Sequence, residues 1–169
     1  MARVRVAVLT ISDAGAKGER ADTSGDAIAE WVARQGHNLA QRSVVPDDTV
    51  EIVRALVDWA DNDRADLVLT TGGTGLSARD RTPEATRAAI DVEAPGIIER
   101  VRVATLESFP RGALSRAVAG VRHKSVIVNL PGSPGGVRDA LAALDPIIQH
   151  ACDIARGAAT DHSPVSKKP

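Results

Sequence analysis

Residues 65–86 decide the fold, and they read Ala65-Asp66-Leu67-Val68-Leu69-Thr70-Thr71-Gly72-Gly73-Thr74-Gly75-Leu76-Ser77-Ala78-Arg79-Asp80-Arg81-Thr82-Pro83-Glu84-Ala85-Thr86. The apolar start, residues 65–70, is typical of a short strand buried on both faces, as in a parallel sheet. Thr82-Pro83-Glu84 offers an N-cap residue followed by proline at the first helical position. The stretch therefore predicts a strand, a glycine-rich turn and a helix in immediate succession.

The glycine-rich turn has the composition of an anion site. Without side chains at Gly72, Gly73 and Gly75, successive backbone N–H groups can approach a phosphate, and the neighbouring threonines add hydroxyl donors. Asp80 would repel such a ligand unless a divalent cation lay between them, so the pairing predicts a magnesium-bound phosphate substrate. By itself the turn is a weak signal, because it lacks the lysine of a P-loop and the spacing of a dinucleotide fingerprint.

The rest of the chain alternates strands and helices. Strands are expected at residues 3–11, 38–45 and 124–130, and helices at residues 23–35, 49–60, 95–107 and 137–157, the last restarting at Asp145-Pro146 as cap and first position. No element is predicted between Phe109 and Gly120. The alternation predicts an α/β fold with a mostly parallel sheet and helices on both faces, in which ligands bind beyond the carboxyl ends of the strands.

A second glycine-rich turn, residues 131–136, follows the strand at residues 124–130. If this strand neighbours the one at residues 66–70, the two turns meet at one sheet edge and form a single crevice. Asp13, Asp47 and Asp80 each come just after a strand, where one or two of them could hold Mg²⁺ beside a nucleotide. The alternative is that Asp47 or Asp48 only caps the following helix. Thr82 already serves as a cap, which leaves Asp80 for a functional role.

Arginines near the turns can be read in two ways. Arg79, Arg81, Arg116 and Arg138 either neutralise phosphates or are solvated surface residues. The four histidines show no metal-ligand spacing, and Trp31, Trp59 and Cys152 are expected in the core.

Composition limits the class of protein. The chain has 169 residues, which suits one domain, expected over residues 1–157 with a flexible tail at residues 158–169. A net charge of -1 and 2% aromatic residues argue against nucleic-acid binding. One cysteine excludes an internal disulfide, and neither a signal peptide nor an apolar run long enough for a membrane span is visible, so we expect a cytoplasmic protein.

Two separated motifs resemble the Mog/MoaB family of molybdenum cofactor biosynthesis proteins: residues 70–86 and Asn129-Leu130-Pro131-Gly132-Ser133-Pro134. The resemblance spans about residues 4–156 and includes the segments Leu9-Thr10-Ile11-Ser12-Asp13, Asp22-Thr23-Ser24-Gly25, Val45-Pro46-Asp47 and Leu114-Ser115-Arg116. It implies a MogA-like fold, a three-layer αβα sandwich that binds molybdopterin. The gephyrin G domain, MoeA-type proteins and CinA-like proteins share this fold.

The resemblance also implies an activity, the Mg²⁺-dependent transfer of AMP from ATP to the terminal phosphate of molybdopterin, which gives adenylyl-molybdopterin and pyrophosphate. Asp47 and Asp80 match the family's essential acidic positions and would be catalytic and metal-binding. The positions that match its substrate-binding residues are Thr71, Gly72, Gly73, Thr74, Gly75, Ser115, Asn129, Pro131, Gly132, Ser133 and Pro134. Those assigned to the nucleotide are Asp13, Ser24 and Gly25. The family forms homotrimers or hexamers, and a molybdenum insertase of the MoeA type is an expected partner.

Two other functions fit the same motifs. One is a MoaB-type protein that binds molybdopterin without adenylylating it, and the other is a nucleotide-processing enzyme of the CinA-like kind. The intact Arg79-Asp80-Arg81-Thr82-Pro83-Glu84 segment favours the adenylyltransferase. Gly135-Gly136 departs from the more polar helix start of some active relatives, which could alter affinity.

Overall fold

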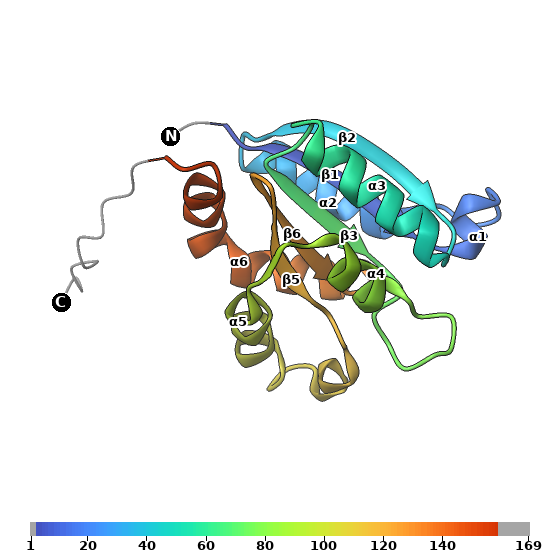
Figure 1. Ribbon diagram of the computed structural model, residues 1–169. Helices are drawn as coiled ribbons and strands as arrows, with labels where there is room; N and C mark the ends of the chain where they lie inside the picture. Colours follow the sequence, from blue (N-terminus) through green and yellow to red (C-terminus); the bar gives the residue numbers. More distant parts are fainter. Residues whose placement is uncertain (1–2, 159–169) are drawn as a thin grey trace.

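A six-stranded sheet runs through the middle of the molecule in the order β2-β1-β3-β6-β5-β4 (Figure 1). The structure is a computed structural model that describes residues 3–158. Its parallel strands are β1 (Arg5–Ile11), β2 (Asn38–Val45), β3 (Leu67–Thr71) and β6 (Ser125–Leu130). At one edge β5 (Ala119–Arg122) pairs antiparallel with β6, and β4 (Val92–Glu93) pairs antiparallel with β5. The predicted mostly parallel sheet is confirmed.

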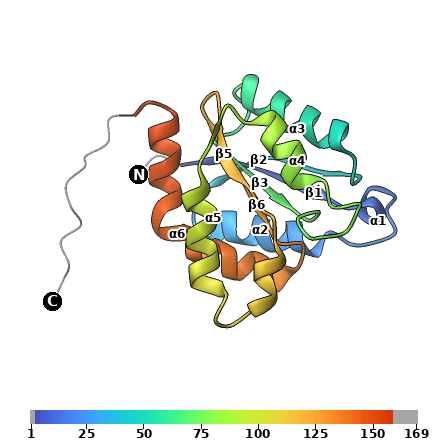
Figure 2. The ribbon, with the colours of Figure 1, turned by 60° about the horizontal axis from the view of Figure 1, so that its bottom comes forward.

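Helices cover both faces of this sheet and complete the three-layer αβα sandwich (Figure 2). One face carries α2 (Thr23–Arg34), α5 (Pro95–Thr105) and α6 (Pro134–Ala155), and the other carries α3 (Thr49–Asp61) and α4 (Thr82–Ala89). Two short elements, α1 (Asp13–Ala16) and η1 (Pro110–Leu114), lie in the connections. Side chains of β1 alternate between the two cores: Val6 and Val8 pack under α2 and α6, whereas Ala7 and Leu9 pack under α3 and α4.

α6 is a single helix of 22 residues, although the sequence pattern predicts a break at Asp145-Pro146. The prediction that a new helix starts at Asp145 is wrong. Tertiary hydrogen bonds engage the polar groups near Pro146, so the helix continues through the proline. The indole Nε1 of Trp31 donates to Asp145 Oδ1 at 2.6 Å, so Asp145 joins α6 to α2 and caps nothing. Arg100 Nε donates to the carbonyl of Ala143 at 2.6 Å, in the turn that Pro146 interrupts.

Aspartates are the N-cap residues of α2 and α3. Asp22 accepts from the N–H of Gly25 and caps α2, where a Cβ on Gly25 would lie 2.1 Å from Asp22 Oδ2. Asp48 accepts from the N–H groups of Val50 and Glu51 and caps α3. This resolves the choice between Asp47 and Asp48, because Asp47 is not the cap.

Both tryptophans are buried as predicted, Trp31 at 1% and Trp59 at 7% exposure, and Cys152 is fully buried. The tail predicted at residues 158–169 lies outside the described residues except for Ala158. Within residues 3–158, no helix has the length and apolar character that crossing a membrane requires.

Asp66 joins the start of the sheet to the end of α6. It is 2% exposed and accepts from the N–H of Arg5 at 2.8 Å, while Arg5 Nη2 and Arg156 Nη1 lie 2.7 and 3.0 Å from its two oxygens. Burial opposes ionisation of Asp66, but hydrogen bonds from the Arg5 side chain and backbone outweigh it and hold the pKa of this carboxyl below its ordinary value.

We expect Asp66→Asn to lower the free energy of unfolding by about 2 kcal/mol at pH 7, because it leaves two guanidinium groups without their shared charge. The folded pKa is depressed, so ionised Asp66 stabilises the protein above the unfolded pKa. That contribution is lost as the pH falls through the folded pKa, and the difference between the variants should shrink there. Urea denaturation at several pH values measures both effects.

The matched control is Asp63→Asn, which removes the exposed partner of the same Arg5. It should cost less than about 1 kcal/mol, the range of surface ion pairs. Equal losses in the two variants would contradict a special role for the buried carboxylate.

Candidate active site

The two glycine-rich turns lie against each other at the carboxyl edge of the sheet. β3 and β6 are neighbours, and Thr71 is in register with Leu130. The hydroxyl of Thr71 donates to the carbonyl of Pro131 at 2.6 Å, and a Cβ on Gly132 would lie 3.3 Å from the Cα of Gly72. The prediction that the two turns meet at one sheet edge is therefore confirmed, but they border two adjoining cavities in place of the predicted single crevice.

Glycine is required in the first turn because backbone atoms approach it closely. Gly72 has φ +97, and a Cβ there would lie 2.3 Å from the carbonyl oxygen of Ile11. A Cβ on Gly73 would lie 2.4 Å from Thr82 Oγ1 and 3.2 Å from Asp47 Oδ1. The turn thus brings bare backbone beside Asp47, and a Cβ on Gly75 would lie 2.9 Å from Oδ2 of Asp80, the carboxylate that the sequence places beside the turn.

Thr82 has a different role from the predicted one. It is the first residue of α4 and follows the N-cap Arg81, which makes no side-chain cap hydrogen bond. Its hydroxyl donates to the carbonyl of Gly72 at 2.9 Å, and its N–H donates to the carbonyl of Gly73 at 3.1 Å. The cap prediction is wrong because the threonine bonds back to the glycine turn and fixes its shape.

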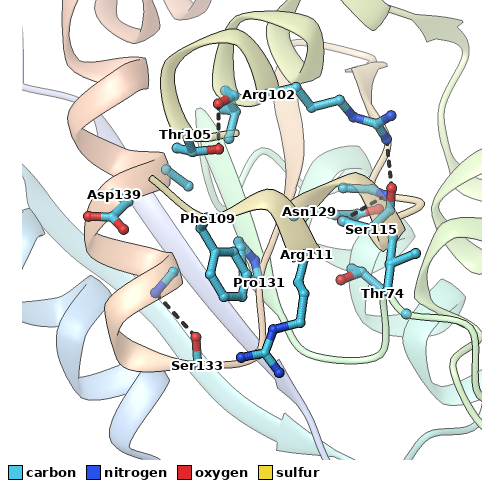
Figure 3. A pocket seen from close by; sticks show the side chains of 18 of the residues that line it. Thr74, Arg102, Thr105, Phe109, Arg111, Ser115, Asn129, Pro131, Ser133 and Asp139 are labelled. Carbon is cyan, nitrogen blue, oxygen red and sulfur yellow. Dashed lines mark hydrogen bonds between the residues drawn. The ribbon is translucent and has the colours of Figure 1, made fainter. Parts of the chain in front are cut away.

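Two cavities open at this edge and share a wall. The α2 cavity, of about 580 Å³, lies between the ends of β1 and β3 and the start of α2. The η1 cavity, of about 510 Å³, lies under α5 and η1 (Figure 3). Gly132 and Ser133 line both. Each volume is in the usual range for a small-molecule site.

The predicted site residues divide between the cavities. The η1 cavity is lined by Thr74, Gly75, Ser115, Asn129 and Pro131, and the α2 cavity by Ser24, Asp47, Thr71, Gly72, Gly73 and Pro134. Asp13, Gly25 and Asp80 line neither. Glycine is needed at position 25 for the Asp22 cap, because a side chain there would collide with the Asp22 carboxylate.

The carboxylates of Asp13 and Asp47 each accept a hydrogen bond from the other residue's backbone, and their pKa values shift in opposite directions. The N–H of Asp13 donates to Asp47 Oδ2 at 2.9 Å, and the N–H of Asp47 donates to Asp13 Oδ1 at 3.0 Å. Arg79 binds both carboxylate oxygens of Asp13, at 2.7 and 2.8 Å from its Nη2. The Arg79 guanidinium lowers the pKa of Asp13, whereas burial, aided by the charges of Asp13 and Asp80, raises the pKa of Asp47.

Asp80 is held from both sides of its loop. Its Oδ2 accepts from the N–H of Ser77 at 2.9 Å. Arg116 donates to the carbonyls of Asp80 at 2.7 Å and Gly75 at 2.8 Å, and pairs with Glu84. Arg79 and Arg116 therefore bind the protein's own carboxylates and carbonyls, so the structure places them as supports of the loop rather than in either cavity.

Asn129 lies at the base of the η1 cavity with its amide fully used. Its Oδ1 accepts from the N–H of Val118 at 3.0 Å, and its Nδ2 donates to the hydroxyls of Thr70 and Thr86 at 2.9 and 2.8 Å. With 2% exposure, Asn129 joins β6 to β3, to α4 and to the residue before β5, below the turns. Its placement favours positioning of the crevice over direct contact with a ligand.

Sequence reasoning missed several cavity residues, among them Asp139 of α6 in the η1 cavity. Arg20 lines the α2 cavity, and Phe109 and Arg111 line the η1 cavity. Phe109 is the only phenylalanine in the chain and is 48% exposed. A lone large aromatic residue in a segment without a predicted element was the available signal. In contrast, Arg81 and Arg138 line neither cavity, and Arg138 lies 4.0 Å from Glu30.

A preformed multi-carboxylate metal centre is absent from the described part of the chain, since no three His, Cys, Asp or Glu side chains there are grouped to hold an ion. Asp47 keeps Oδ1 beside Gly73, and Asp80 is close enough to influence its ionisation. Mg²⁺ is commonly held by one or two carboxylates together with substrate phosphates and water. The pair therefore fits an ion that arrives with a nucleotide.

Comparison with known proteins shows which family the chain belongs to. The family model described as a probable molybdopterin binding domain matches residues 7–150. The chain belongs to this family. The molybdopterin adenylyltransferase of Helicobacter pylori (strain J99) is 39% identical over 159 residues, which cover 93% of this chain and 90% of that protein. The family membership inferred from the motifs is confirmed.

Solved structures of the family share the fold. MoaB from Thermus thermophilus is 47% identical with a TM-score of 0.86, covering 94% of this chain and 99% of its own. The Mog protein from Mycobacterium ulcerans is 41% identical with a TM-score of 0.85, covering 91% of this chain and 99% of its own. The predicted MogA-like sandwich is confirmed.

We expect Gly72→Ala to lower the free energy of unfolding by about 2–5 kcal/mol, since it combines an unfavourable positive φ with a collision against Ile11. The control is Gly96→Ala, in α5, where a Cβ meets no atom within 4 Å. That change should stabilise the protein by about 0.5–1 kcal/mol. Chemical denaturation of both variants measures the contrast, and a neutral Gly72→Ala would contradict the close approach of the Ile11 carbonyl to the first turn.

Asp47→Asn should leave the melting temperature at pH 7 unchanged or higher. The folded pKa of Asp47 is raised, so the folded state holds this proton more tightly than the unfolded state does, and stability falls as the pH rises from the ordinary carboxyl pKa through the raised one. Asparagine removes that cost, and its benefit should vanish below the ordinary carboxyl pKa. By contrast, Asp48→Ala removes a helix cap and should cost about 1 kcal/mol. Thermal melts of both variants and the wild type at pH 3 and pH 7 measure these differences.

Proposed function

We propose that this protein is a molybdopterin adenylyltransferase that transfers AMP from ATP to the terminal phosphate of molybdopterin. The observation that carries the proposal is the pair of cavities that meet at Gly132 and Ser133. A reaction between two bound substrates needs adjoining sites, because holding the reacting groups together supplies much of the rate. The name and similarity of the Helicobacter pylori relative support the same activity.

The η1 cavity would take molybdopterin and the α2 cavity ATP. A phosphate oxygen of molybdopterin attacks the α-phosphorus of ATP, a new P–O bond forms, and the electrons of the broken P–O bond leave with pyrophosphate. The reacting groups would meet at the shared wall, where the turns present Gly72, Gly132 and Ser133. Catalysis would come chiefly from positioning and charge neutralisation.

Asp47 and Asp80 would hold the magnesium ion that accompanies ATP. When bound, Mg²⁺ supplies positive charge to the phosphate oxygens. Asp47 contributes its Oδ1 beside Gly73, while its Oδ2 stays bonded to the N–H of Asp13. Arg79 keeps Asp13 in place, and Arg116 keeps the Asp80 loop in place. Ser24, whose hydroxyl lies 3.4 Å from the Gly132 carbonyl, would contact the nucleotide side of the junction.

The family resemblance also supports an oligomeric state and a cellular location for this protein. We infer a cytoplasmic homotrimer, or a hexamer of two trimers, that passes its product to a molybdenum insertase of the MoeA type. Exposed apolar side chains such as Val103, at 84% exposure, and Val50, at 61%, support contacts between copies.

The direct test incubates the purified protein with molybdopterin, ATP and Mg²⁺ under anaerobic conditions and follows adenylyl-molybdopterin and pyrophosphate. We expect both products in equal amounts. Tight molybdopterin binding without product would reject the enzyme and favour the binding-only function.

Asp80→Asn tests the metal role with little structural change, because asparagine can still accept from the N–H of Ser77. Turnover should fall about 10–100-fold, with the loss partly recovered at high Mg²⁺, while molybdopterin binding is kept. Glu99→Gln, an exposed substitution on α5 away from both cavities, is the control and should retain full turnover. Full turnover by Asp80→Asn would remove Asp80 from the mechanism.

A further inference from the structure

The wall of the η1 cavity contains an aromatic, a cationic and an acidic side chain that together could bind a pterin. Phe109 and Arg111 come from the η1 segment, and Asp139 comes from α6 on the opposite wall (Figure 3). The Arg111 guanidinium carbon lies 5.8 Å from the centre of the Phe109 ring. The remaining lining near η1 includes apolar groups from Ile98, Val101 and Leu114. A flat heterocycle with one polar edge and an anionic tail would complement this wall.

Phe109 stands out because the chain is otherwise poor in aromatic residues. Aromatics make up 2% of the sequence, and both tryptophans are buried in the core. Phe109 alone among them lines either of the two cavities at the sheet edge, within the described residues, and it remains 48% exposed there. Its backbone is fixed, since its N–H donates to Thr105 and its carbonyl accepts from Gly112, both at 2.9 Å. An exposed aromatic face on a fixed backbone is suited to stacking against a ring.

The carboxylate of Asp139 can accept hydrogen bonds from the polar edge of a pterin ring. The pyrimidine ring of a pterin presents an amino group beside a ring N–H, two donors that a carboxylate accepts together. Adenine presents an amino group beside a ring nitrogen acceptor, which a carboxylate repels. Asp139 therefore distinguishes a pterin from the nucleotide base that the neighbouring cavity would take.

Asp139 lies along α6 away from the residues that the two cavities share. Asp139 lies six residues after Ser133 along α6, which corresponds to about 9 Å of helix. Arg111 is directed toward the Ser133 end, where the two cavities meet (Figure 3). A pterin edge at Asp139 would thus leave the terminal phosphate near Arg111 and the shared wall.

We propose that Asp139 and Phe109 are specificity-determining residues that bind the pterin ring, one at its edge and one at its face, while Arg111 holds the phosphate end. This inference rests on the proposed function, in that it takes molybdopterin as the ligand of the η1 cavity. It assigns the substrate contacts to three residues outside the family motifs that identify the crevice.

The test measures the Kd of the full-length protein for molybdopterin by anaerobic ultrafiltration, without ATP. Asp139→Asn places an N–H donor against the donor edge of the pterin, and Phe109→Ala removes the stacking face. Each should raise the Kd roughly tenfold, within the range found for lost base stacking or an unpaired hydrogen bond. Asp139→Glu should recover part of the affinity. Arg138→Gln, next to Asp139 but outside both cavities, is the control and should leave the Kd unchanged.

Phe109→Trp adds a direct reporter, because the two native tryptophans lie in the core. Its fluorescence should be quenched by molybdopterin and not by ATP, and the KM for ATP should stay within about twofold in all variants, since none of them alters the α2 cavity. A normal Kd in both Asp139→Asn and Phe109→Ala would overturn the proposal. So would a change of oligomeric state in Phe109→Ala with an unchanged Kd, which would make Phe109 an interface residue.

The outcomes separate this inference from the proposed activity. Weakened binding in the variants of a protein that forms no adenylyl-molybdopterin would reject the enzyme and keep the pterin contacts. Normal turnover with an unaffected Kd and KM for molybdopterin would keep the enzyme and reject the contacts. A native protein that does not bind molybdopterin would overturn both.

Discussion

The contact between two bare backbone turns is the constraint on which the rest of the site depends. A Cβ on Gly132 would lie 3.3 Å from the Cα of Gly72, and a Cβ on Gly72 would lie 2.3 Å from the carbonyl oxygen of Ile11 at the end of β1. The Thr71 hydroxyl fastens the turns by donating to Pro131. Because β3 and β6 are adjacent and parallel, this contact places the two cavities side by side, with Gly132 and Ser133 lining both. Adjoining cavities can hold two reacting groups together, which supplies much of the rate of a reaction between them.

The sequence predicts this architecture well where local pattern and tertiary structure agree. Buried strands followed by glycine turns are sufficient to infer a parallel sheet with a crevice at its carboxyl edge, and the neighbouring strands β3 and β6 bear this out. The pattern fails where a tertiary contact replaces a local one. Asp145-Pro146 has every local feature of a helix start, yet Trp31 takes the carboxylate and α6 continues. Thr82 likewise serves the glycine turn and leaves α4 without a side-chain cap.

Site residues are harder to predict than the fold, because a sequence does not show which polar groups are already bonded within the protein. Asn129 belongs to the motif that identifies the family, but its amide is used up by Val118, Thr70 and Thr86. Arg79 and Arg116 have the charge to bind phosphate and instead bind Asp13 and the Asp80 loop. The position of Phe109 could not be predicted from periodicity, because the segment that contains it and η1 has neither a strand nor a helix pattern.

Because Arg79 and Arg116 bind groups of the protein itself, the α2 cavity has little positive charge to bind a triphosphate. Within the described residues, Arg20 is the cationic side chain that lines the α2 cavity, while Asp22 and Asp47 on the same wall carry negative charge. Asp22 is offset by its ion pair with Arg42, at 2.9 Å, but Asp47 has no such partner among the described residues and its pKa is raised. A triphosphate entering this cavity would meet more negative than positive charge, which is unfavourable unless a cation accompanies it. The same carboxylate that is costly to the folded protein alone would become favourable with that cation present, so the charge balance of the cavity argues for a metal-bound nucleotide over a free one.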